Sequence, residues 1–81
     1  MGTGMLRRIV ISQPAAGETL EDTLQRAMRL LRKNGVKVSG GAIERNGGET
    51  TAAIVLLNDP ADKPQAIQIL AGVGISAESV P

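Results

Sequence analysis

The stretch from Val36 to Leu57, VKVSGGAIERNGGETTAAIVLL, constrains the fold more than any other part of the chain. It predicts two strands joined by a turn at Asn46-Gly47-Gly48, a sequence typical of β-hairpins. We expect the second strand to lie at the centre of a sheet with both faces covered, because its small and apolar residues are consecutive. Alternation along the strand divides them into two faces. One face takes Thr51, Ala53, Val55 and Leu57, and the other takes Ala52, Ile54 and Leu56.

A glycine pair, Gly40 and Gly41, interrupts the first strand of this hairpin. Under strict alternation Val38 and Ile43 would point to opposite faces of the sheet. A β-bulge at Gly40-Gly41 would add one residue and return Ile43 to the buried face. The alternative is that a ligand or a partner chain approaches the glycine backbone closely. The sequence leaves both interpretations open.

A helix is predicted before the hairpin, from Glu18 or Leu20 to Lys33. Its apolar residues recur at helical spacing, Thr19 is placed to cap its start with Asp22 at the third position, and Asn34-Gly35 ends it. The apolar stripe consists of Leu20, Leu24, Ala27, Met28 and Leu31. The basic residues Arg26, Arg29 and Lys33 form a second stripe, which indicates a solvated face or, as the alternative, a contact with an anionic partner.

A second helix follows the hairpin. Asp62 is the expected N-cap, Gln65 its capping-box partner, and Gly72 with Gly74 the end. The expected buried stripe contains Ala66, Ile67, Leu70 and Val73.

Short apolar segments at 6–12 and 75–80 complete the pattern as the first and last strands. The order strand, helix, strand, strand, helix, strand predicts an α+β fold, the ferredoxin-like βαββαβ sandwich, with a four-stranded antiparallel sheet and two helices on one face. We expect one domain at 6–81, preceded by a disordered tail or an added remnant at 1–5. Because no segment remains to cover the second face of the sheet, we expect a homodimer that forms through this open sheet face.

Composition excludes several classes of site. The chain of 81 residues contains no Cys, His, Phe, Tyr or Trp, and its formal net charge is +1. The chain therefore has no thiolate nucleophile, no imidazole for acid–base catalysis and no Cys or His ligand for zinc. It also has no aromatic side chain that could stack on nucleic-acid bases. We expect no cofactor, no metal, no nucleic-acid partner and no membrane association, and a cytoplasmic location.

An enzymatic role is not predicted. Acid–base catalysis would depend on carboxylates, most of which have a helix-cap or turn explanation, and no pair among them is distinguished by separated roles. The candidates are Glu18, Glu21, Asp22, Glu44, Glu49, Asp59, Asp62 and Glu78.

The segment Val36-Lys37-Val38-Ser39-Gly40-Gly41-Ala42-Ile43-Glu44, the apolar strand after it and the pattern Ala66-Ile67…Leu70…Gly74-Ile75 resemble the NIL domain, a relative of the ACT domains. The chain departs from that family at Lys37-Val38-Ser39, where NIL domains carry Asn-Ile-Leu. The resemblance implies a non-enzymatic regulatory domain that dimerises and binds a small ligand, such as an amino acid, at or near the dimer interface. It implies a pocket made by the loop after the first strand and the start of the second strand. The ligand-binding residues would be Ser12, Gln13, Gly17, Lys37, Ser39 and Gly40.

Each of these residues also has a local explanation, since loops favour Ser, Gln and Gly and an edge strand favours Lys. The alternative function is therefore a structural, oligomerisation or protein-interaction module that has no small-molecule ligand.

Overall fold

The predicted α+β fold is confirmed by the computed structural model, which describes residues 7–79. The expected tail at 1–5 lies outside the described residues. Four strands form one antiparallel sheet in the order β2-β3-β1-β4. The elements in chain order are β1 (Arg8–Ile11), α2 (Leu20–Lys33), β2 (Val38–Asn46), β3 (Glu49–Leu57), the 3₁₀ turn η1 (Pro60–Asp62), α3 (Lys63–Ala71) and β4 (Glu78–Ser79).

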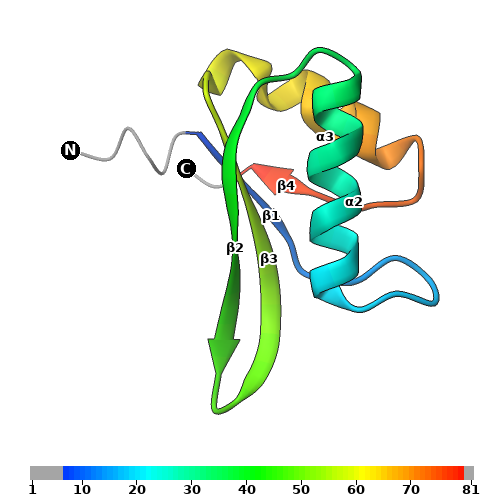
Figure 1. Cartoon of the computed structure of the whole chain (residues 1–81), viewed down its shortest axis with the longest axis vertical. Helices are drawn as coiled ribbons and strands as arrows, with labels where there is room; N and C mark the ends of the chain where they lie inside the picture. The colour runs from blue at the N-terminus through cyan, green and yellow to red at the C-terminus, as the bar shows by residue number, and fades with distance from the viewer. Residues whose placement is uncertain (1–6, 80–81) are drawn as a thin grey trace.

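Both helices lie on the same side of the sheet, and the β2–β3 hairpin extends beyond the two shorter strands (Figure 1). The central strands β1 and β3 pair with Ile9 opposite Val55 and Ile11 opposite Ala53. These four side chains are fully buried in the core between sheet and helices. The prediction that the apolar strand is central is therefore confirmed.

Strand β3 is two-sided, as its sequence indicates. Ala53, Val55 and Leu57 belong to the core, whereas Ile54 and Leu56 point away from the helices and are only half-buried. The consecutive apolar residues thus supply the core and, at the same time, an apolar patch on the outer face.

Helix α2 begins and ends at the predicted residues. The Thr19 hydroxyl accepts a hydrogen bond from the Asp22 backbone N–H at 3.1 Å, which satisfies one of the unpaired donors of the first turn. At the other end Gly35 has φ +84°, and the Val36 N–H donates to the Leu31 carbonyl at 2.9 Å in a Schellman motif. This turn delivers Val36, 2% exposed, directly into the core.

A β-bulge is present in β2, but it lies one residue before the predicted position at the glycine pair. The pairing shifts between Val38, opposite Leu57, and Gly40, opposite Leu56, so that Ser39 is the extra residue. Ile43 consequently lies opposite Ala53 and packs against the core, as expected from the bulge interpretation. The hairpin turn also forms where predicted: Gly47 and Gly48 both have positive φ, at 62° and 86°, as a two-residue type I′ turn requires.

Two expectations about the second helix are wrong. Asp62 makes no side-chain capping bond, because η1 extends the helical backbone through this residue. Asp59 has the capping role instead, and its carboxylate accepts from the Ala61 N–H at 2.9 Å. Val73 does not continue the buried stripe and is 41% exposed, since Gly74 turns the chain there and Ile75 enters the core in its place.

The last strand is also shorter than predicted. Within the described residues it spans Glu78–Ser79, whereas the sequence predicted a strand at 75–80.

Candidate functional site

The face of the sheet that the helices leave uncovered is the strongest candidate for a functional surface. Its residues alternate with the core residues of the same strands and are paired across the strands, which places them together. We call this surface the open face. It carries Arg8 and Val10 from β1, Gly40, Ala42 and Glu44 from β2, Ala52, Ile54 and Leu56 from β3, and Glu78 from β4.

A shallow hollow of about 410 Å³ lies in the open face over strands β2 and β3. Ile54 and Leu56 form its apolar floor, and Arg8 borders it from β1. Three small residues of β2, Gly40, Gly41 and Ala42, supply the rest of the lining. We call it the Gly40 hollow, because a side chain at that position would project into open space.

The two adjacent glycines have different surroundings. A Cβ atom added at Gly41 would lie 2.8 Å from Met28 Sδ and 3.0 Å from Leu24 Cδ1, both on α2. A Cβ atom added at Gly40 would meet nothing within 4 Å. The close approach of the chain's own helix thus favours glycine at position 41, whereas no packing within the described residues favours it at position 40.

Arg8 is incompletely satisfied within the described residues. Its Nε atom is buried and has no hydrogen-bond partner, and the same holds for Nε of the preceding Arg7. A buried guanidinium donor without an acceptor is costly. Of the two residues, Arg8 lies on the open face, opposite Leu56.

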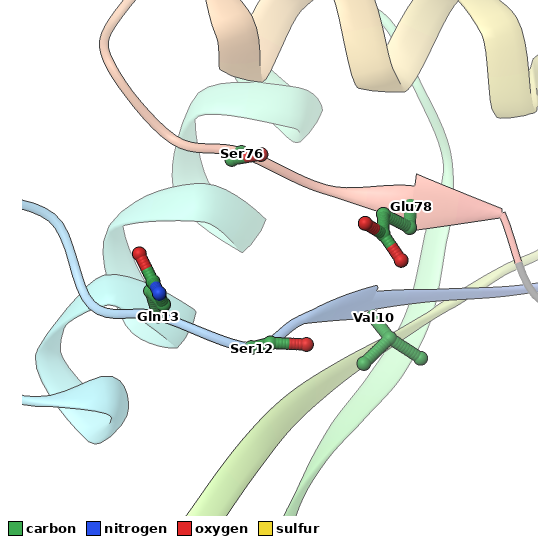
Figure 2. A pocket seen from close by; sticks show the side chains of 5 residues that line it. All are labelled: Val10, Ser12, Gln13, Ser76 and Glu78. Atoms are coloured by element: carbon green, nitrogen blue, oxygen red, sulfur yellow. The ribbon is translucent and has the colours of Figure 1, made fainter.

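A second, polar hollow lies at the β1–β4 side of the open face and has a volume of about 240 Å³. Figure 2 shows Ser12 and Gln13, at the end of β1, across from Glu78 on β4 and from Ser76 on the segment that leads into β4. Val10 completes the lining. The polar groups are two hydroxyls, one amide and one carboxylate, so Glu78 is the only charged residue among the described residues that line this hollow.

The structure brings together only some of the predicted ligand-binding residues. Ser12 and Gln13 line the polar hollow, and Gly40 lines the other one. Ser39 is the bulge residue and donates its hydroxyl to Asn58 Oδ1. Gly17 lies in the exposed loop before α2, with φ +79°.

Lys37 and Ser12 lie at opposite ends of the sheet. The Lys37 carbonyl accepts from the Asn58 N–H at 3.1 Å, and Lys37 borders a separate hollow with Arg32 and Asn58. Ser12 follows Ile11, which pairs with Ala53. The spacing along β3 separates the two positions by roughly 20 Å. Lys37 and Ser12 of a single chain therefore cannot bind the same small ligand.

Sequence reasoning missed Arg8, Ser76 and Glu78 as site residues. Arg8 could have been found, because alternation places it beside Val10 on the face opposite Ile9 and Ile11. Ser76 and Glu78 had no comparable signal, since their place beside Ser12 depends on the fourth strand returning to pair with β1.

Among the carboxylates, Glu18 has a changed acidity. The Arg26 guanidinium donates to both Glu18 oxygens, at 2.9 and 3.1 Å, and the buried Thr23 hydroxyl donates at 3.0 Å. The Arg26 hydrogen bonds are the main reason why the pKa of Glu18 is lowered, with smaller contributions from Thr23 and from the charge of Arg26, against a partial opposing effect of desolvation. Thr23 Oγ1 also accepts from the Ala15 N–H at 3.0 Å. Glu18 therefore fastens the β1–α2 loop to α2.

Within residues 7–79 no three acidic side chains gather into a group that could hold a metal ion. None of the helices in this range is long and apolar enough to cross a membrane. The chain finds no match among protein-family models, curated proteins or solved structures.

Proposed function

We propose that this chain is a small non-enzymatic domain that self-associates, and that the open face of its sheet binds a second copy. The proposal rests on one observation, which is that the two faces of the sheet are covered differently. Helices α2 and α3 bury one face (Figure 1), while no described element covers Val10, Ile54 and Leu56 on the other face. Sheets in small domains normally bury an apolar face against another layer. A second copy provides that layer.

The size of the domain favours this assembly. A chain of 81 residues buries only roughly 60–65% of its unfolded surface, so that its own core gives modest stability. Association through the open face would bury the exposed parts of Ile54, Leu56 and Val10 and stabilise the folded state by mass action.

The arrangement of carboxylates supports a non-enzymatic role. Glu18, whose pKa is lowered, is held by Arg26 and Thr23, and this is the environment of a structural ion pair. A general acid near neutral pH needs a raised pKa. The regulatory role of such a domain rests on the resemblance to NIL and ACT domains.

Replacement of Ile54 by Asp tests the self-association. Wild type is expected to sediment as a dimer at micromolar concentration, and Ile54→Asp as a folded monomer, because the carboxylate would be desolvated at the centre of the interface. Val73→Asp is the matched control, since Val73 is the exposed large apolar residue of the described range but lies after α3. A monomeric wild type, or a dimer that tolerates Ile54→Asp, would contradict the proposal.

A second candidate function is the binding of a small ligand in the polar hollow. Glu78, with the Ser12 and Ser76 hydroxyls and the Gln13 amide beside it, favours a small molecule that carries a protonated amine, such as an amino acid. Because this hollow is part of the same face, association would cover it. A thermal-shift screen of amino acids and simple amines tests this candidate: a ligand should raise the melting temperature of wild type but not of Glu78→Gln. A screen without any shift would refute it.

A further inference from the structure

We propose that Arg8 of one copy pairs with Glu44 of the second copy, twice about a two-fold axis at Ile54, and that these pairs set the orientation of the dimer. This inference rests on the self-association proposed above. It adds the contacts that choose one arrangement of the two sheets among many.

The pairing of the strands places Arg8 and Glu44 symmetrically about Ile54. Arg8 lies opposite Leu56, on the β1 side of β3, and Glu44 lies opposite Ala52, on the β2 side. Leu56 and Ala52 are each two residues from Ile54 along β3. The spacings within and between strands put both charged residues about 8 Å from Ile54, in opposite directions along one diagonal of the sheet.

A two-fold axis exchanges the two ends of this diagonal. The axis is parallel to the two facing sheets, lies midway between them, passes over Ile54 and is perpendicular to the diagonal. Rotation about this axis places each Arg8 over the partner's Glu44 and brings the two copies of Ile54 into contact. With the same spacings the strands of the two sheets cross at roughly 70°, close to the orthogonal class of sheet packing.

The charges on the open face are complementary in this arrangement. Neither Arg8 nor Glu44 takes part in the two ion pairs found within residues 7–79, which are Glu18–Arg26 and Glu21–Arg45. An Arg8–Glu44 contact between two copies joins a guanidinium to a carboxylate through charge-assisted hydrogen bonds.

Glu78, the other carboxylate of the open face, does not fit the same symmetry. It lies on β4, level with Val10 and two strands away from Ile54. The position opposite to it across Ile54 lies beyond β2, which is the edge of the sheet. Arg8 and Glu44 are therefore the pair that a two-fold axis at Ile54 can match.

Charge reversal in each of the two positions, followed by mixing, tests the inference. Arg8→Glu alone and Glu44→Arg alone each place like charges in both contacts, and we expect the dissociation constant of each homodimer to rise by about 100-fold. In an equimolar mixture, a heterodimer of the two variants again contains two opposite-charge contacts. We expect it to form with an affinity within about 10-fold of wild type. Analytical ultracentrifugation, with one variant carrying a fluorescent label, measures all four constants.

Arg29→Glu is the matched control, because it makes the same change of charge on the solvent side of α2. It should leave the dissociation constant within about 3-fold of wild type. Circular dichroism of every variant checks the fold, and recovery in the mixture is possible only for folded chains.

The outcomes separate this inference from the proposed function. Recovery in the mixture supports the Arg8–Glu44 pairs. A dimer that Ile54→Asp disrupts, but that neither reversal weakens or the mixture fails to restore, overturns the pairs and leaves the open face as the interface. A monomeric wild type overturns both.

Discussion

The two faces of the sheet are made by neighbouring residues of the same strands, yet they differ in what covers them. Leu57 is fully buried beneath the helices, and Leu56, the preceding residue, is half-buried on the open face. Both are leucines of the central strand β3. The difference shows that an apolar side chain on a strand does not reveal which face is the core, because the cover is provided by other elements.

The glycine pair shows the same contrast on β2. Gly41 is tied to the covered face by the contact with Met28 and Leu24, whereas Gly40 opens a hollow on the uncovered face. The covered face is thus specified by packing within one chain. The open face is specified, in our proposal, by packing between two chains.

The largest expected effect comes from truncating the two leucines. Leu57→Ala should lower the free energy of unfolding by about 2–5 kcal/mol, because it leaves a cavity in the core. Leu56→Ala should cost less than half as much at concentrations below those at which the dimer forms, because its side chain is only half-buried in one chain, and it should weaken the dimer. Urea denaturation over a range of protein concentrations measures both quantities. Equal losses in the monomer would mean that the open face is already buried within one chain.

A smaller effect is expected from adding a methyl group at each glycine. Gly41→Ala should destabilise the domain by about 1 kcal/mol, at the low end for overpacking, because the flexible Met28 can yield. Gly40→Ala should stay within about 0.5 kcal/mol of wild type, since its Cβ enters open space. Thermal denaturation of both variants compares them. A Gly40→Ala chain less stable than Gly41→Ala would reverse the roles assigned to the two glycines.

Local sequence signals predicted the elements of the fold and much of the sheet. The Thr19 cap, the Gly35 end of α2 and the Gly47-Gly48 turn depend on nearest neighbours, and all three form as expected. The bulge was predictable because Val38 and Ile43 must both reach the core. The prediction of Asp62 as N-cap was wrong because Asp59, followed by Pro60, provides a cap three residues earlier. The sequence alone does not show which of two overlapping caps will form.

The candidate site was less predictable, because its residues come together only through strand pairing. Ser12 meets Ser76 and Glu78 across more than sixty positions of sequence, by way of the β1–β4 register. The NIL resemblance predicted that Lys37 and Ser12 line one pocket, but the two residues lie at opposite ends of the sheet. Local patterns carry no information about which end of a sheet a loop will reach.

The smallest expected effect is a pH dependence of the free energy of unfolding, which distinguishes the covered face from the open face. The pKa of Glu18 is lowered below its ordinary value of 4.5 in the folded chain. The unfolded chain therefore takes up the proton first as the pH falls, and the stabilisation by Glu18 is complete above the unfolded pKa and is lost as the pH drops through the folded pKa. Acid titration of the free energy of unfolding should show a loss that begins near pH 4.5 and that Glu18→Gln removes.

The dependence on protein concentration assigns this loss to one face. Glu18, Arg26 and Thr23 belong to one chain, so the part of the acid loss that Glu18→Gln removes should be the same at low and high protein concentration. The Arg8–Glu44 pairs join two chains, so Glu44→Gln should lower stability only at concentrations where the dimer forms, and it should leave the Glu18 part of the acid loss unchanged. If the acid loss that Glu18→Gln removes instead depended on protein concentration, the β1–α2 loop would belong to the interface and the open face would not be its only component.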